Sequence, residues 1–352
     1  MHTVPVKTGK PYEVLIGSGI LDQAGEMILK VIKPCRAAII TDDTVDALYG
    51  KRVEESLKKA GFSVCRMHFA HGEENKNLHT YMQLMDFLCE SQITRTDIIV
   101  ALGGGVVGDT AGFAAATYLR GVRFVQVPTT LLAMVDSSVG GKTAVDLPHG
   151  KNLCGAFWQP SLVVCDTDTL NTLPEETYID GLAECLKHGV LKDESLFDLL
   201  ATKDARKNIN EIVARNVAIK AGYVMQDERD TGLRQQLNLG HTLGHAVEKL
   251  SNFTITHGQA VAIGMVYAAR IAEKLQVCDA SVPQRIESAL THVGLPTAAP
   301  YSAEEIARVA LGDKKRMGDV IHMVLPQCIG ACTLHDVNVN ILKDIISLGV
   351  NA

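Results

Sequence analysis

Residues 97–113 read DIIVALGGGVVGDTAGF, and this stretch decides the fold class. Ile98 to Leu102 are all apolar, which is typical of a strand buried on both faces of a parallel sheet. Glycines follow at once, and residues 110–118 then have helical spacing. Gly103, Gly105 and Gly108 form a G-x-G-x-x-G turn between strand and helix, whose backbone amides can approach a pyrophosphate. The stretch therefore predicts an α/β domain with a dinucleotide site.

The turn departs from the usual dinucleotide fingerprint in one respect. The acidic residue that normally follows about twenty positions later and bonds the ribose is missing, since Gln126 and its neighbours do not supply it. Asp42, at the exit of another predicted strand, can serve instead. The alternative is a tight strand-to-helix turn that binds no nucleotide.

The sequence on either side alternates strand and helix patterns. Further strands are predicted at 37–40, 63–69 and 122–127, and helices at 53–60 and 79–91. Beyond Pro174 helical spacing dominates, at 175–188, 196–200, 209–227, 241–250, 258–275 and 283–293, before a strand at 321–325. We therefore predict a Rossmann-like α/β domain over residues 1–170 and a mostly α-helical domain over residues 171–352.

Composition excludes several classes of function. The chain has 352 residues, of which 47% are hydrophobic, and a formal net charge of −6. Such a chain lacks the basic surface of a general nucleic-acid binder, and no window holds the ~20 apolar residues of a membrane span. A signal-peptide pattern is absent, and the nine cysteines form no CxxC pair. We therefore expect a cytoplasmic protein with reduced thiols.

A polar cluster follows the strand at 122–127. Residues 136–143 read DSSVGGKT, and Lys151 and Asn152 come soon after. Glycines and lysines together favour anion binding over a plain solvated loop. The phosphate loop of ATPases is excluded, because its spacing needs a glycine where Asp136 stands.

Three histidines gather in the helical half. Residues 240–248 read GHTLGHAVE, which places His241 and His245 on one helical face, and His257 precedes the next helix. The cluster predicts a divalent metal site, against the alternative of hydrogen-bonded core histidines. Spacing alone selects His241 and His245 as the ligand pair. The accompanying carboxylate stays open among Glu184, Glu248 and Asp227.

With these motifs, the chain resembles the 3-dehydroquinate synthase family of the sugar-phosphate cyclase superfamily. The segments that carry the resemblance follow in order along nearly the whole chain, at 103–121, 128–146, 150–160, 172–189, 232–248, 257–265 and 312–315. The resemblance implies an NAD-binding domain, a helical domain, an active site in the cleft between them and a divalent metal, zinc or cobalt. It implies Glu184, His241 and His257 as metal ligands, and makes His245 a residue beside the reacting phosphate.

The resemblance also implies the remaining site residues. The implied catalytic residues are Lys142, His245, Lys187, Asn152 and Arg120, the last reaching the phosphate from a neighbouring subunit of a homodimer. The implied substrate-binding residues are Asp136, Lys220, Arg234, Asn238 and Lys314. The implied NAD-binding residues are Asp42, Glu73, Lys76, Gly104, Gly105, Val106, Asp109, Thr129, Thr130, Lys142 and Lys151.

The implied activity belongs to the shikimate pathway. A phosphate-eliminating lyase of this family converts 3-deoxy-D-arabino-heptulosonate 7-phosphate into 3-dehydroquinate and phosphate. The route is transient oxidation by NAD, elimination, reduction, ring opening and an intramolecular aldol. The alternatives are a cyclase acting on sedoheptulose 7-phosphate or glucose 6-phosphate, and a metal-dependent polyol dehydrogenase, which would accumulate NADH.

One position departs from the family pattern. The family usually has His-Gly-Glu at its third histidine motif, and this chain has His257, Gly258 and Gln259. If the usual glutamate supports the metal ligand from behind, Gln259 keeps the acceptor and loses the charge, which would weaken metal binding.

Overall fold

The computed structural model describes residues 1–311 and 319–350. The chain divides into two compact units. Unit 1 comprises Met1–Pro174 and Lys220–Arg229, and unit 2 comprises Glu175–Ile219 and Asp230–Ala352. Within the described ranges, no helix combines the length and apolar character needed to cross a bilayer.

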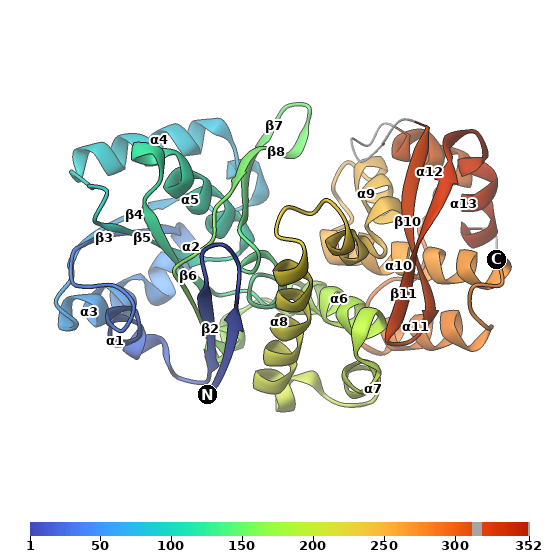
Figure 1. Cartoon of the computed structure of the whole chain (residues 1–352), viewed down its shortest axis with the longest axis horizontal. Helices are drawn as coiled ribbons and strands as arrows, with labels where there is room; N and C mark the ends of the chain where they lie inside the picture. The colour runs from blue at the N-terminus through green and yellow to red at the C-terminus, as the bar shows by residue number, and fades with distance from the viewer. Residues whose placement is uncertain (312–318, 351–352) are drawn as a thin grey trace. The chain divides into compact units, whose positions relative to one another are not determined.

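Unit 1 is built on a seven-stranded sheet (Figure 1). Its strands, in spatial order, are β1 (His2–Val6), β2 (Tyr12–Gly17), β9 (Leu162–Asp166), β6 (Arg123–Pro128), β5 (Ile98–Gly103), β3 (Arg36–Asp42) and β4 (Ser63–Phe69). Every neighbouring pair is parallel except β1 and β2. Each residue of β5 is buried, as the apolar run predicts.

Helices cover both faces of this sheet (Figure 1). Ile39 and Val100 point to the face covered by α1 (Ala24–Leu29) and α3 (Lys51–Lys59). Ile40 and Ala101 point to the opposite face, which α4 (Leu78–Glu90) and α5 (Gly105–Thr117) cover. Because side chains alternate along a strand, a parallel strand between two helical layers must be apolar throughout. The predicted doubly wound architecture is therefore confirmed.

Unit 1 contains strands β1, β2 and β9 and helix α1, which were not predicted, and it differs from the predicted pattern in two further details. Helix α5 begins at Gly105, five residues before the predicted start, because packing against the sheet outweighs the poor helix propensity of its glycines. The polar cluster after β6 runs into the hairpin of β7 (Lys142–Leu147) and β8 (Gly150–Phe157), where no strand had been predicted. This hairpin packs on α5, since a Cβ at Gly112 would lie 2.5 Å from Thr143.

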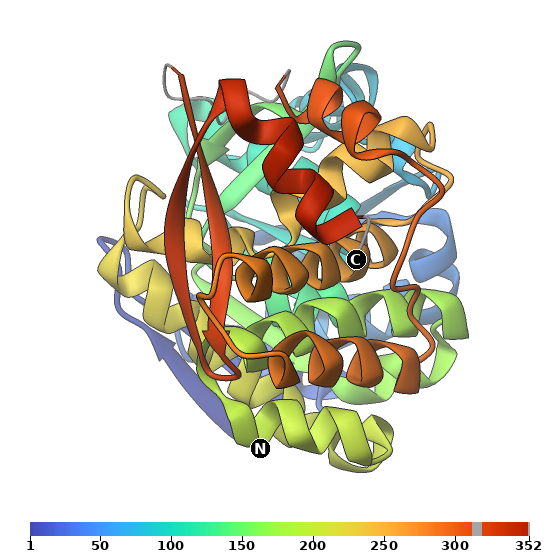
Figure 2. The same cartoon turned by 90° about the vertical axis from the view of Figure 1, so that its right-hand side faces the viewer.

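Unit 2 is mostly helical, as predicted, with one added hairpin (Figure 2). Its helices are α6 (Glu175–Lys192), α7 (Glu194–Thr202), most of α8 (Ile209–Gln226), α9 (His241–Leu250), α10 (His257–Lys274), α11 (Ser281–His292), α12 (Ala303–Ala310) and α13 (Leu342–Val350). Strand β10 (Val320–Cys328) confirms the strand predicted at 321–325, and it pairs with β11 (Ala331–Asn338), which had not been predicted. Short elements complete the chain, among them α2 (Asp43–Val45) and the 3₁₀ turn Leu233–Asn238.

Candidate metal centre and nucleotide site

Two helices begin at the predicted metal ligands. His241 is the first residue of α9, and His257 is the first residue of α10. The helices meet at backbone distance, because a Cβ at Gly264 would lie 2.0 Å from the carbonyl oxygen of Gly240, and one at Gly244 would lie 2.6 Å from that of Ala260. Small residues thus bring the two histidines together, with ring centroids 5.3 Å apart.

Glu184 of α6 completes this cluster. Its Oε1 lies 3.4 Å from Nε2 of His241 and 3.4 Å from Nε2 of His257. Tetrahedral zinc with ligand bonds near 2.1 Å separates its ligand atoms by about 3.3–3.5 Å, so the spacing fits one ion held by all three residues. The Glu184 side chain is fully buried. Among the described residues, none gives its oxygens a hydrogen bond of good geometry, although the Lys187 ammonium forms an ion pair with Oε2, so the carboxylate already faces one cation.

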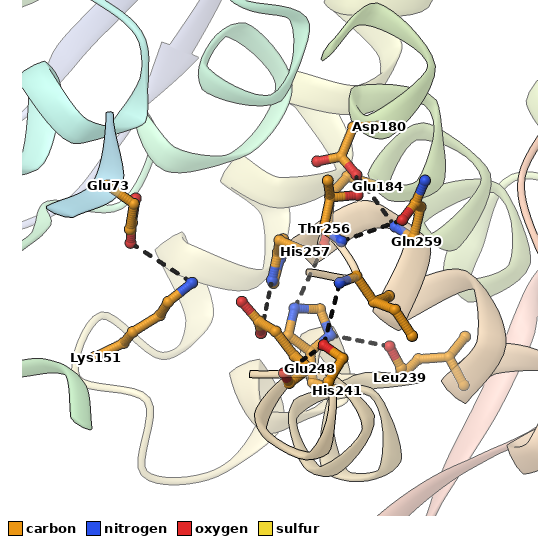
Figure 3. Close-up of polar contacts among 12 residues, drawn as sticks. Glu73, Lys151, Asp180, Glu184, Leu239, His241, Glu248, Thr256, His257 and Gln259 are labelled. Atoms are coloured by element: carbon orange, nitrogen blue, oxygen red, sulfur yellow. Dashed lines mark hydrogen bonds and ion pairs between the residues drawn. The ribbon is translucent and has the colours of Figure 1, made fainter. Parts of the chain in front are cut away.

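Outer contacts orient the two imidazoles (Figure 3). Nδ1 of His241 lies 3.1 Å from the carbonyl oxygen of Leu239, which fixes the proton on Nδ1 and leaves Nε2 for a metal. Nδ1 of His257 faces the buried Glu248 carboxylate at 3.9 Å. Glu248 therefore supports a histidine from behind, while Glu184 is the carboxylate that faces both imidazoles.

His245 lies beside this trio. Its ring centroid is 5.3 Å from that of His241 and 6.0 Å from that of His257. With Glu248 and His257 it forms a second group whose ligand atoms lie within 4.8 Å of one another. The structure thus places all three predicted histidines at one site. The ligand atoms of Glu184, His241 and His257 lie within 4.8 Å of one another.

The charges of the site depend on Lys187, which forms a buried ion pair with Glu184. Burial alone would raise the pKa of Glu184, but Lys187 and His241 hold it well below its usual range. Burial and Lys187 together lower the pKa of His241 to about 4. Burial opposes protonation of His257, yet Glu184 and Glu248 raise its pKa to about 10. A metal ion must therefore displace a proton from His257 when it binds.

Unit 1 presents the predicted nucleotide residues at the carboxyl edge of its sheet. The strand order reverses between β3 and β5, and such switch points form the ligand crevice of open α/β sheets. Asp42 ends β3 beside the glycine turn that follows β5. A Cβ at Gly104 would lie 3.0 Å from Thr130, and one at Gly108 would lie 2.7 Å from Gln126. The turn thus has room only for glycines, as close approach to a pyrophosphate requires.

A buried ion pair links the predicted nucleotide and catalytic sets. Nζ of Lys76 donates to Oδ2 of Asp109 at 2.7 Å and to Oδ1 of Asn152 at 2.6 Å. Asn152 has a left-handed backbone (φ 56°), and its N–H donates to Asp146 at 2.7 Å. Burial raises the pKa of Asp109, although Lys76 opposes the shift. Asp146 was not predicted from the sequence. Its contact with Asn152 depends on the turn between β7 and β8, which was not predicted either.

Other predicted residues of unit 1 lie along the same loops. Lys151 is 3.8 Å from Glu73 (Figure 3). Nζ of Lys220 pairs with Oδ1 of Asp136 at 2.8 Å. Thr129 follows β6, and its N–H donates to the carbonyl oxygen of Gly103 at 3.0 Å. Three remaining positions are Val106 in the first turn of α5, Lys142 at the start of β7, and Arg120, which has a left-handed backbone (φ 67°).

The remaining predicted residues belong to unit 2 or lie outside the described residues. Arg234 is buried, and Asn238 ends the same 3₁₀ turn just before α9. Lys314, with the segment 312–315, lies outside the described residues.

Gln259 has a different role from the one its sequence context suggests. Its Oε1 accepts a hydrogen bond from the N–H of Thr256 at 3.2 Å, which is one half of a capping box at the start of α10. Glu248, and not residue 259, lies beside Nδ1 of His257. Asp180, which accepts from the N–H of Gln259 at 3.1 Å, was not predicted from the sequence. Its position four residues before Glu184 on one helix was the sequence feature that could have pointed to it.

Comparison with known proteins agrees with both units. Family models of 3-dehydroquinate synthase match residues 66–180 (N-terminal) and 181–316 (C-terminal). The 3-dehydroquinate synthase of Geobacter metallireducens is 47% identical over 348 residues, which is 95% of each chain.

Two solved structures have closely similar folds. One is 2-deoxy-scyllo-inosose synthase complexed with carbaglucose-6-phosphate, NAD⁺ and Co²⁺ (TM-score 0.89, 27% identity, covering 99% of this chain and 100% of that one). The other is 2-epi-5-epi-valiolone synthase from Streptomyces hygroscopicus subsp. jinggangensis with NAD⁺ and Zn²⁺ bound (TM-score 0.86, 26% identity, covering 96% of each).

Proposed function

The chain belongs to the 3-dehydroquinate synthase family, and we propose that it is a carbon–oxygen lyase that converts 3-deoxy-D-arabino-heptulosonate 7-phosphate into 3-dehydroquinate and phosphate. The observation that carries the proposal is the trio of Glu184, His241 and His257, beside the buried cation Lys187. Identity of 47% to a synthase, against 27% to a cyclase complexed with a hexose phosphate analogue, favours the heptulosonate as substrate.

The metal ligands would be Glu184, His241 and His257. The donor set is one carboxylate and two imidazoles, which suits zinc or cobalt and leaves a position open for substrate. When bound, a divalent ion at this position polarises a substrate oxygen and NAD takes up and returns a hydride. Glu248 and the Leu239 carbonyl keep the imidazoles turned toward the ion.

The nucleotide would lie along the carboxyl edge of the unit 1 sheet. Gly104, Gly105 and Val106 present the free N–H groups of a helix N-terminus to a pyrophosphate. We assign Asp42 to a ribose hydroxyl, for which it would be the acceptor. The rest of the proposed NAD set is Glu73, Lys76, Asp109, Thr129, Thr130, Lys142 and Lys151.

The substrate carries a phosphate and a carboxylate, and the chain supplies cations for both. We assign Lys142, Asn152, Lys187 and Arg120 to the phosphate. In this position they hold a phosphate oxygen where it can accept the proton removed during elimination. We assign His245 to proton transfer during the reaction.

Two further parts of the proposal concern binding and assembly. Asp136, Lys220, Arg234, Asn238 and Lys314 are assigned to the rest of the substrate. Arg120 would act on the site of a second copy of the chain, which makes the proposed assembly a homodimer.

One assay tests the function. The zinc-loaded protein is incubated with NAD⁺ and, separately, with the heptulosonate phosphate, sedoheptulose 7-phosphate and glucose 6-phosphate. Phosphate release from the heptulosonate, with a carbocyclic product and no accumulated NADH, is the expected result. Faster release from another sugar phosphate would identify a different cyclase. NADH accumulation with glycerol and no phosphate release would identify a polyol dehydrogenase.

A further inference from the structure

The helices that carry Glu184 and His257 make a second contact through Asp180, one helical turn away from the metal centre. Asp180 and Glu184 are four residues apart on α6, so both face the same neighbour. Asp180 contacts the first turn of α10, which begins with His257. Figure 3 shows Asp180, Thr256 and Gln259 grouped beside the histidines.

The contact is made by one carboxylate oxygen. Oδ1 of Asp180 accepts from the N–H of Gln259 at 3.1 Å and from the hydroxyl of Thr256. The first N–H groups of a helix have no partner within the helix, and an acidic group there also interacts favourably with the helix dipole. Asp180 therefore caps α10 from another helix, whereas most capping residues belong to the helix they cap.

Backbone packing holds the same two helices together. A Cβ at Gly258 would lie 2.1 Å from the carbonyl oxygen of Asp180. Helix α10 thus touches α6 at the residue next to His257, one turn before Glu184. Any displacement at this point would change the 3.4 Å separation between His257 and Glu184.

We propose that Asp180 is a positioning residue of the metal centre. It clamps the start of α10 to α6, so that Glu184 and His257 are held at ligand spacing before a metal binds. It also supplies the negative charge at this helix terminus, where Gln259 contributes only a neutral amide. The inference rests on the proposed function through its metal site, and it adds a residue that does not touch the metal.

The test measures zinc affinity by competition with a chromophoric chelator, on the full chain. Asp180→Ala is expected to weaken zinc binding about 10- to 100-fold, the usual range for residues that support a metal ligand. Asp180→Asn keeps an acceptor oxygen and should lose less. In the double variant Asp180→Asn with Gln259→Glu, the carboxylate and the amide exchange places, and we expect affinity within about threefold of the wild type.

Two controls separate positioning from general destabilisation. Asp279 accepts from the N–H and hydroxyl of Ser281 at the start of α11 in the same unit, so Asp279→Ala removes a matched cap. It should lower thermal stability without changing zinc affinity. The visible absorption of bound Co²⁺, which reports ligand geometry, should change in Asp180→Ala and in Gly258→Ala, but not in Asp279→Ala.

The outcomes are distinguishable. Wild-type zinc affinity and an unchanged cobalt spectrum in Asp180→Ala would overturn the role of Asp180. So would a double variant that binds zinc no better than Asp180→Asn alone. If the wild-type chain itself binds no zinc, the metal centre fails, and the proposed function fails with it.

Discussion

The ion pair between Lys187 and Glu184 leads to a prediction about stability in the absence of metal. Lys187 is 1% exposed and Glu184 is fully buried. Lys187→Met removes the cation from the Oε2 side of the buried carboxylate, which then faces the protonated His257 and the neutral His241. Breaking one side of a buried pair typically costs about 3–5 kcal/mol. For a unit of this size, that cost lowers the melting temperature by about 6–20 °C.

Metal should reverse much of this loss. A divalent cation held by Glu184 neutralises the same carboxylate. In Lys187→Met, this cation is also no longer repelled by the ammonium of Lys187. We therefore expect zinc to raise the melting temperature of Lys187→Met more than that of the wild type. Saturating zinc should bring the two proteins to within about 1–2 kcal/mol, the range of ordinary substitutions.

The assay is differential scanning calorimetry in EDTA and in excess zinc. The transition that responds to zinc identifies unit 2. Lys249→Met, which removes an exposed lysine from α9, is the matched control and should change stability by less than about 0.5 kcal/mol. A metal-free Lys187→Met protein that melts within 2 °C of the wild type would refute the reasoning. An equal zinc response in both proteins would refute it as well.

Three further predictions follow from individual contacts. His257→Ala should lose bound zinc in metal analysis, whereas His245→Ala should retain it and lose turnover; an empty site in His245→Ala would restore the spacing-based ligand pair. Gly264→Ala should weaken zinc binding and lower the melting temperature, because its Cβ would lie 2.0 Å from the carbonyl oxygen of Gly240, the residue before α9. Burial opposes ionisation of Asp97, but hydrogen bonds from Thr94 and Arg36 lower its pKa. The wild type should therefore be more stable than Asp97→Asn above pH 4, and chemical denaturation should show this advantage fading as the pH falls below the ordinary aspartate pKa; an advantage independent of pH would contradict the assignment.

Local patterns predicted the central strands and most helices, but they did not predict β1, β2, β9 or β11. The apolar run 98–102 could only be a strand covered on both faces, and α9 begins and ends where the spacing around His241 predicts. The β7–β8 hairpin was not predicted, because its residues alternate weakly and its position depends on packing against Gly112 of α5. Strand pairing of this kind is decided by contacts far apart in the sequence.

The carboxylate ligand of the metal could not be selected from local patterns either. Glu184, Glu248 and Asp227 were equivalent from the sequence, because helical spacing relates residues only within one helix. The structure distinguishes two of them where α6, α9 and α10 meet: Glu184 faces two imidazole Nε2 atoms, and Glu248 faces Nδ1 of one. The family resemblance had implied Glu184, but the spacing of the histidines could not. The role of Asp180 could not be predicted for the same reason, since its partners lie at the start of α10.

The pairing of charges explains why the net charge of −6 says little about an anionic substrate. In unit 1, Lys76 pairs with Asp109 and Lys220 pairs with Asp136. In unit 2, Lys187 pairs with Glu184. Each acid pairs with a lysine in a buried place, where an unpaired ammonium would be costly. A metal ion on Glu184 would weaken the attraction between that carboxylate and Lys187, which would make this lysine available to the proposed phosphate. Metal should therefore increase the affinity for inorganic phosphate in the wild type, and this increase should disappear in Lys187→Met.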